Sequence, residues 1–161
     1  MVAYFTLADK ILDMKLKVSK SITKHQINQI SLLWNEVYPL KLIDRFGQLM
    51  IDTEIIEHHI LVSEDQDMIG WAATFLRDDE VWFSIMISPA NQNKGYGKML
   101  LGSLKSNFKQ LSGWVIDHNN DYKKDGSIYC TPIQFYLKND FHISHERLES
   151  DIISAAKITF G

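Results

Sequence analysis

Residues 81–108 read VWFSIMISPANQNKGYGKMLLGSLKSNF, and this stretch decides the fold. Its first part, residues 81–87, is rich in aromatic and branched side chains, which favours a buried strand that Pro89 ends. The turn at residues 92–97 contains two glycines, and leucines then recur at helical spacing from Gly97 onward. A strand, a tight turn and a helix N-terminus present free backbone N–H groups together. The stretch therefore predicts an anion-binding site.

The whole chain has 161 residues, a size typical of one domain, so we expect a single domain over residues 1–161. Its formal net charge is −3 and its basic residues are scattered, which argues against a nucleic-acid partner. No apolar run approaches the roughly 20 residues that cross a bilayer, and residues 1–17 lack the pattern of a secretion signal, so we expect no membrane partner. Cys130 is the only cysteine, which excludes an intrachain disulfide and a cysteine-based metal site. The simplest expectations are a cytoplasmic location and no bound metal.

The residues before the opening stretch predict a strand followed by a helical region. Residues 11–18 alternate partly between apolar and polar side chains, which predicts a half-buried first strand. Thr23 and Gln26 fit a capping box at the start of a helix, and residues 40–50 resume an amphipathic pattern. The last residues that we assign to this helical region are Ile55, Ile56 and His58.

Three apolar runs joined by short charged turns predict an antiparallel meander. These runs cover residues 60–63, 68–76 and 81–87. Residues 113–118 form a further apolar run, which should lie parallel to the 81–87 strand because strand, helix and strand make a crossover unit. A polar loop at 119–127 precedes a short helix with Thr131 as its cap and Pro132 in its first turn. Two closing strands are expected at residues 141–148 and 152–160. The fold class is α/β with a mixed sheet.

The turn at residues 92–97 resembles the Q/R-x-x-G-x-G/A signature of the GCN5-related N-acetyltransferases, the GNAT family. Residues 85–89, a strand end followed by proline, also resemble the segment that family members place before that turn. Residues 135–141, FYLKNDF, resemble the family's second signature, often F-Y-x-K-x-G-F, with Asp140 in place of the glycine. The resemblance covers residues 11–160. It implies a mixed, mostly antiparallel sheet of six to seven strands, with flanking helices and a splayed pair of parallel strands.

The resemblance implies that acetyl-coenzyme A (acetyl-CoA) is the cosubstrate and that a primary amine of a small molecule or a protein is the acceptor. The pyrophosphate would meet the turn, where Gly95 and Gly97 would leave room for it. The pantetheine arm would add to the edge of the 81–87 strand as an extra strand. The residues that we expect to contact the coenzyme are Ile85, Ile87, Gln92, Asn93, Lys94, Gly95, Tyr96, Gly97, Lys98 and Lys138. Family members often dimerise, so a homodimer also stays open.

By the same resemblance, Tyr136 lies near the thioester sulfur. A phenol has a reference pKa of about 10 and a thiol one of about 8.5, so this tyrosine is protonated at neutral pH. It can then act as a general acid that donates to the departing thiolate. The alternative is a helix tyrosine that only packs.

The group that deprotonates the acceptor amine is not evident from the sequence. Where the histone-modifying branch of the family has a glutamate, the same offset from the turn lands on Val81, and Glu80 would face the other side of the strand. The remaining candidates are Asp117 and His118 at a strand end, and Glu64 or Glu80 elsewhere. Free amine at equilibrium can also suffice. Two functions therefore stay open: an acetyltransferase, and an acyl-CoA-binding sensor or interaction module that transfers nothing.

Overall fold

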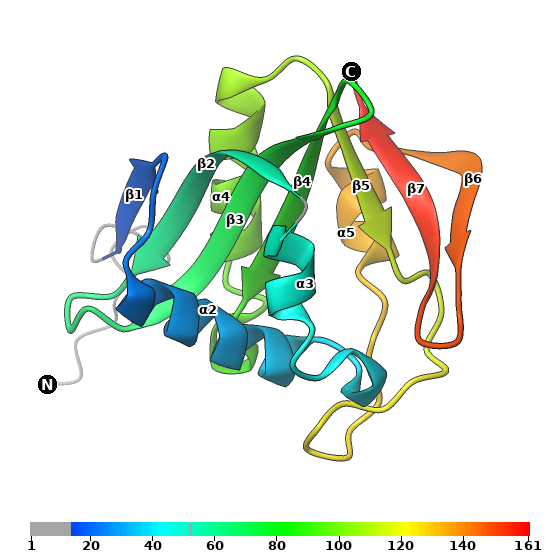
Figure 1. Cartoon of the computed structure of the whole chain (residues 1–161), viewed down its shortest axis with the longest axis horizontal. Coiled ribbons are helices and arrows are strands. Elements are labelled where there is room, and N and C mark those ends of the chain that lie inside the picture. Colours follow the sequence, from blue (N-terminus) through cyan, green and yellow to red (C-terminus); the bar gives the residue numbers. More distant parts are fainter. Residues whose placement is uncertain (1–13, 52) are drawn as a thin grey trace, which may run out of the picture.

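The computed structural model describes residues 14–51 and 53–161, in which seven strands form one sheet in the order β1-β2-β3-β4-β5-β7-β6 (Figure 1). The strands are β1 (Lys15–Ser19), β2 (Glu54–Val62), β3 (Met68–Arg77), β4 (Glu80–Ile87), β5 (Leu111–Val115), β6 (His142–Glu149) and β7 (Ser154–Phe160). The helices are α2 (Lys24–Val37), α3 (Phe46–Ile51), α4 (Tyr96–Asn107) and α5 (Ile133–Lys138), with short 3₁₀ helices η1 (Leu40–Leu42) and η2 (Pro89–Asn91). The predicted α/β class with a mixed sheet is confirmed.

All neighbouring strands pair antiparallel except β4 and β5, which run parallel. This parallel pair is joined only at Trp82 and Ser112, near the start of each strand. Beyond that point the two strands diverge, as Figure 1 shows. We call the region between their carboxyl-terminal parts the split. The predicted splayed parallel pair is thus confirmed, and the split is where the sheet has an unpaired internal edge.

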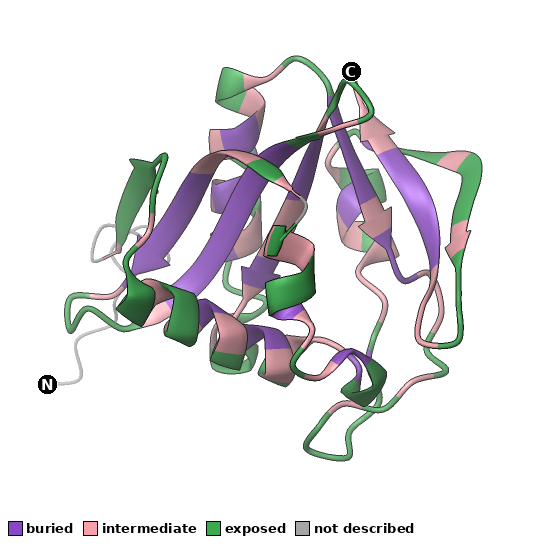
Figure 2. Cartoon of the chain, viewed as in Figure 1, coloured by how far each residue is buried: buried purple, intermediate pink, exposed green. Residues whose placement is uncertain are grey.

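Helices cover both faces of the sheet. α4 and α5 lie on one face and α2 and α3 on the other, each over its own apolar cluster (Figure 1). Figure 2 shows that β3 and most of β2 are buried between these layers, whereas β1 and β6 at the two edges are exposed. Leu100, Leu101 and Leu104 on α4 are at most 1% exposed, so burial of apolar area fixes this helix on the sheet. The turn before α4 is thereby held at the mouth of the split.

The helical interpretation of Ile55, Ile56 and His58 is wrong, since all three lie in β2. Residues 54–62 read EIIEHHILV, and this run pairs with β3 from end to end. Periodicity alone does not separate a short apolar strand from the end of a helix, and pairing with β3 decides the outcome here. The preceding residues 40–50 also do not form one helix. They divide into η1 and the start of α3, and Asp44 between them has a φ of 59°.

The first strand is exposed and not half-buried as predicted. Leu16 is 38% and Val18 49% exposed, because β1 lies at the sheet edge and pairs with β2 alone among the described residues. Residues 11–13 of the predicted strand, and the rest of the N-terminal segment before them, lie outside the described residues.

The end of β5 and the start of α5, both near the split, differ from the predicted positions by a few residues. β5 ends at Val115, so Asp117 and His118 lie past the strand and not on it. α5 begins at Ile133 with Pro132 as its N-cap, so the prediction of Thr131 as the cap and Pro132 in the first turn is wrong by one residue. The N–H of Ile133 donates to the Thr131 hydroxyl at 3.3 Å, so this threonine still supports the start of the helix.

Candidate functional site

The turn before α4 has the geometry of an anion site. Gly95 caps the helix in the left-handed conformation with a φ of 88°, and Asn93 has a φ of 61°. In the described part of the chain, no backbone hydrogen bond uses the N–H groups of Asn93, Lys94 or Gly95 as donors. The N–H groups of the first helical turn also lack intrahelical acceptors. Lys94 and Lys98 are exposed beside them, so the turn offers both N–H donors and positive charge to an anion.

Three other residues of the turn act through packing. The Gln92 side-chain amide donates to the carbonyl oxygen of Ile87 at 3.1 Å, which ties the turn to the end of β4. Tyr96 is 3% exposed, so its backbone and not its ring is available at the turn. We expected Gly97 to leave room for a ligand, whereas a Cβ there would point into α5, 3.3 Å from the ring of Phe135. Gly97 therefore lets α4 approach α5.

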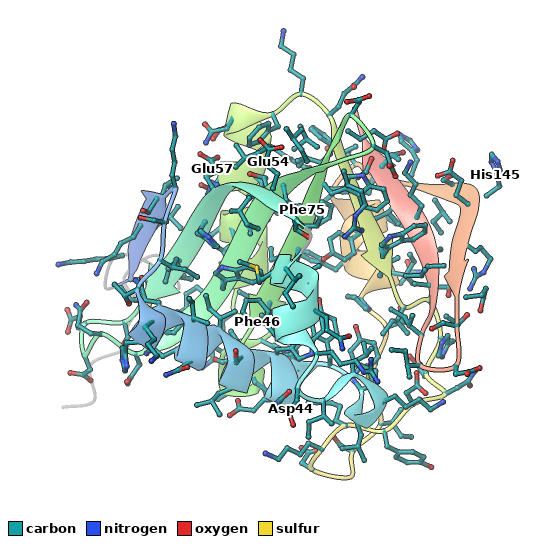
Figure 3. The ribbon with its side chains drawn as sticks, in the orientation of Figure 1. Asp44, Phe46, Glu54, Glu57, Phe75 and His145 are labelled. Carbon is teal, nitrogen blue, oxygen red and sulfur yellow. The ribbon has the colours of Figure 1, made fainter. Side chains whose placement is uncertain are left out.

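A buried polar network fixes α4 to β2. Nδ1 of the fully buried His59 lies 2.7 Å from the Ser103 hydroxyl on α4, and its Nε2 lies 2.9 Å from Glu57. Asn107 at the end of α4 donates to the same Glu57 oxygen at 2.8 Å; Figure 3 labels Glu57. Burial raises the pKa of Glu57, but the hydrogen bonds from Asn107 and His59 and the nearby positive charge bring it below its ordinary value. The network anchors the helix that carries the turn, and no sequence pattern had singled it out.

The edge of β4 at the split has unpaired backbone groups. The Ser88 N–H donates to Ile69 of β3 at 2.9 Å, and backbone groups point to alternate sides along an antiparallel strand. The backbone groups of Ile85 and Ile87 therefore point away from β3 and toward the split. The Gln92 side chain already bonds the Ile87 carbonyl oxygen. The Ile87 N–H and both backbone groups of Ile85 are therefore the groups that remain available at this edge. An extended amide-bearing ligand can pair there as an added strand.

Three tyrosines converge on the split from both faces of the sheet. Tyr136 of α5 lies on the α4 face, with its ring centroid 5.8 Å from that of Phe83 on β4. Tyr38, after α2, and Tyr129, before α5, stack on the opposite face with centroids 6.4 Å apart. Burial raises the pKa of Tyr136 well above its ordinary value, and the nearby phenols of Tyr38 and Tyr129 raise it further. Tyr136 is therefore protonated at neutral pH and can donate.

Ser84 of β4 joins this cluster from the strand. Burial raises the pKa of the Tyr38 phenol, and a hydrogen bond with Ser84 lowers it in part. Sequence reasoning singled out neither Tyr38, Tyr129 nor Ser84. Each looks like an ordinary core or strand residue in its local sequence, and only the fold brings them to one place.

Asp117 and His118 lie at the open end of the split, as their place after β5 predicts, but neighbours engage both. Arg147 of β6 binds the Asp117 carboxylate through two hydrogen bonds of 2.9 and 3.1 Å, and these hold the pKa of Asp117 below its ordinary value. Nδ1 of His118 accepts the N–H of Asn120 at 3.2 Å, and its Nε2 lies 4.0 Å from Asp121. A carboxylate with a lowered pKa is a weaker base, and the His118 lone pair is occupied. Neither group is poised to take a proton from an amine.

The two glutamates considered as bases lie elsewhere. Glu80 is at the start of β4, where its carboxylate accepts from Ser112 at 3.1 Å and pairs with Lys157 at 3.0 Å. This is the closed end of the split. Glu64 is exposed in the turn between β2 and β3, away from the β4–β5 pair.

Lys138 lies toward the far end of the paired helices. The start of α4 contacts α5 at Phe135, whereas Lys105, farther along α4, donates to the Asn139 carbonyl at the end of α5. The two helices therefore run in the same direction, and Lys138 is nearer to the Lys105 end than to the turn. A contact between Lys138 and phosphate stays a prediction.

Within residues 14–51 and 53–161, no group of three or more His, Cys, Asp or Glu side chains is arranged to hold a metal ion. None of the helices in this part of the chain is long and apolar enough to cross a membrane.

Comparison with sequence families gives one match. The family model described as "Acetyltransferase (GNAT) domain" matches residues 56–143, more than half of the chain. This span contains the turn, both strands of the split and Tyr136. No curated protein matches the sequence.

Solved structures share this fold at low sequence identity. An acyl-CoA N-acyltransferase from Pseudomonas aeruginosa has a TM-score of 0.67 and 12% identity, covering 92% of this chain and 99% of that one. A spermidine N-acetyltransferase from Vibrio cholerae has a TM-score of 0.60 and 13% identity, with coverages of 92% and 94%. A phosphinothricin acetyltransferase from Sinorhizobium meliloti, in complex with AcCoA, has a TM-score of 0.57 and 15% identity, with coverages of 91% and 87%. At these identities the likeness establishes the fold.

Proposed function

This chain belongs to the GNAT acetyltransferase family, and from that premise we propose that it transfers an acetyl group from acetyl-CoA to a primary amine of a small molecule or a protein. One observation carries the proposal: the free N–H groups before α4 and the unpaired edge of β4 lie at one end of the split, and Tyr136 of α5 packs against Phe83 of the same strand. These three features match the pyrophosphate, the amide-bearing arm and the thioester of acetyl-CoA. A coenzyme-bound structure of similar fold supports this cosubstrate.

The residues that would hold acetyl-CoA follow from this match. The backbone N–H groups of Asn93, Lys94 and Gly95 and of the first turn of α4 would bind the pyrophosphate, with charge from Lys94 and Lys98. The backbone of Ile85 and Ile87 would pair with the pantetheine arm. Gln92 would act by holding the turn against β4.

In the proposed reaction the neutral amine nitrogen attacks the acetyl carbonyl carbon. The new C–N bond forms, the C–S bond breaks, and the Tyr136 hydroxyl donates its proton to the departing sulfur. The tyrosinate is reprotonated as the amine nitrogen gives up its proton. Because Asp117 is paired and the His118 lone pair is occupied, we assign no side chain as the base, and the free-amine fraction at equilibrium supplies the nucleophile.

The same engagement of Asp117 and His118 favours the second candidate, an acyl-CoA-binding sensor or interaction module that transfers nothing. The two functions differ in whether an amine accelerates loss of the acetyl group. A cytoplasmic location and a homodimer stay predictions under either function.

The deciding experiment mixes the protein with acetyl-CoA and a broad panel of primary amines and follows free thiol. Calorimetry of acetyl-CoA binding accompanies it. The transferase predicts release above the hydrolysis background with at least one amine, at a rate that rises with pH as the neutral amine fraction grows. Binding without amine-dependent release across the panel favours the binding module, and absence of binding contradicts both functions.

A further inference from the structure

The surface next to Tyr38 and Tyr129 has a hollow that the proposed reaction leaves unassigned. Its volume is about 270 Å³, and its lining residues are Leu40, Lys41, Asn120, Asp121 and Tyr122. Two separate parts of the chain form it: the segment after α2, and the loop between β5 and α5. Figure 1 shows this loop, in yellow, beside the segment that contains η1.

Backbone contacts hold these two parts together. The Leu40 N–H donates to the Tyr122 carbonyl at 2.7 Å, and Pro39 forms an antiparallel bridge with Lys123. The loop also closes on itself through a bridge between Tyr122 and Ile128. These backbone contacts fix the two walls of the hollow relative to each other.

The hollow lies beside the two stacked tyrosines Tyr38 and Tyr129. Leu40 is two residues from Tyr38, and the Tyr129 N–H donates to the Asp121 carbonyl at 2.9 Å. Tyr38 and Tyr129 stack on each other, and Tyr136 lies at the split beyond them. The phenols of Tyr38 and Tyr129 lie near enough to Tyr136 to raise its pKa, so the hollow adjoins the neighbours of the proposed proton donor. An amine that reaches the split from this face would leave the rest of its molecule in the hollow.

The two charged side chains that line the hollow, Lys41 and Asp121, already pair with each other. Lys41 lies 3.4 Å from one Asp121 oxygen, and His118 lies 4.0 Å from the other. The Asp121 side chain is only 10% exposed, so it has little capacity left for a second ammonium group. The apolar lining is accessible, since Leu40 is 48% and Tyr122 62% exposed. Covering such side chains with an apolar group is favourable, whereas bringing an extra cation beside Lys41 is not.

We propose that this hollow is the subsite for the body of the acceptor, and that it selects primary amines with an aromatic or aliphatic group over polyamines. The inference rests on the proposed function, because it assigns the acceptor of the same site. The Tyr122 ring and the Leu40 side chain contact the apolar body, and the paired Lys41 and Asp121 form the polar rim.

Primary amines that share the same reacting nitrogen and differ only in the rest of the molecule test this assignment in the thiol-release assay. We expect kcat/KM for 2-phenylethylamine to exceed that for ethylamine about tenfold, and butylamine to be preferred over 1,4-diaminobutane, as for a pocket that buries an apolar group. Tyr122→Ser should lower kcat/KM for 2-phenylethylamine about tenfold and leave ethylamine unchanged. Leu32→Ser is the control, because Leu32 is 64% exposed on α2 and does not line the hollow; it should change neither value.

A measurement of amine binding tests the proposed subsite independently of the proposed reaction. Saturation-transfer NMR should show contact between native protein and the ring protons of 2-phenylethylamine, and Tyr122→Ser should reduce it. If this contact is seen and lost as expected but no amine releases thiol, the proposed function fails and the subsite stands. If the native protein shows no ring contact, if Tyr122→Ser affects both amines alike or neither, or if 1,4-diaminobutane is preferred, the subsite assignment is overturned.

Discussion

The two ends of the β4–β5 pair are built from different chemical groups. At the closed end the Glu80 carboxylate accepts from Ser112 and pairs with Lys157, which also pairs with Glu146 at 3.0 Å. At the open end, the described residues provide no protein partner for the N–H groups before α4 or for part of the β4 edge. Polar groups that bond each other stabilise the fold, whereas unpaired groups at a surface are available to a ligand. We therefore expect stability at the closed end and chemistry at the open end.

The aromatic residues at the two ends differ in the same way. At the closed end the Trp82 and Trp114 rings lie 5.2 Å apart, and Lys157 lies 5.1 Å from the Trp82 ring centroid. Near the open end the phenols of Tyr38, Tyr129 and Tyr136 gather, and we propose the last as the proton donor. One parallel strand pair thus combines a packed joint with a reactive opening.

The largest expected effect comes from Gly95→Glu at the open end, which should raise the Kd for acetyl-CoA about 100-fold or more. A side chain at a φ of 88° costs about 1–2 kcal/mol, and the carboxylate repels the pyrophosphate at the helix N-terminus. Calorimetry measures the change. Gly102→Glu is the matched control, because Gly102 is an exposed residue of the same helix with open space at its Cβ. Unchanged affinity in Gly95→Glu would falsify the phosphate site.

Tyr136→Phe should lower kcat by about 100- to 1,000-fold while the KM for acetyl-CoA stays nearly constant, since a general acid acts in the transition state. Burial raises the pKa of Tyr136 above 10.0, so its protonated, donating form persists throughout the neutral and mildly alkaline range. The pH profile of kcat in the native enzyme should accordingly show no loss of this donor below about pH 10. Thiol release measured against pH tests both points. An unchanged kcat and pH profile in Tyr136→Phe would show that the tyrosine only packs.

A smaller effect is expected from Tyr38→Phe on the acceptor face, about a fivefold decrease in kcat/KM for the amine with unchanged acetyl-CoA binding. The variant removes one hydroxyl and its hydrogen bond with Ser84, worth about 1 kcal/mol. Ser84→Ala should match it, and the double variant should be no worse than either single one. Weakened acetyl-CoA binding in both variants would place this pair on the coenzyme side and contradict the division between the two faces.

The smallest effect is expected at the closed end, from Glu80→Gln. The hydrogen bonds from Lys157 and Ser112 lower the pKa of Glu80, so its stabilising effect is present above pH 4.5 and is lost as pH falls through the lowered value. Because the Glu80 side chain is 47% exposed, the variant should lose at most about 1 kcal/mol at neutral pH. Its Tm should fall less than that of the native protein on acidification, with thiol release unchanged at neutral pH. Equal acid sensitivity of the two proteins would contradict this role.

The sequence predicted most of the fold, and its main error has a local cause. The meander, the crossover and the closing hairpin follow from apolar runs and turns that are separate in the sequence. The extent of β2 does not, because Ile55 and Ile56 form an apolar pair that fits the end of a helix as well as a strand. Pairing with β3 settles the matter, and that pairing depends on residues more than ten positions away.

The proposed coenzyme side of the site was determined by the sequence itself. The left-handed Gly95, the start of α4 and the place of Tyr136 on α5 depend on backbone preferences and helical spacing among neighbouring residues. The acceptor side was decided only by tertiary structure. The Arg147 side chain donates hydrogen bonds to Asp117, and the Leu40 N–H donates to the Tyr122 carbonyl. Both pairs are far apart in the sequence. No local pattern encodes contacts between distant residues, so the pairing of Asp117 and the proposed acceptor hollow exist only once the chain has folded.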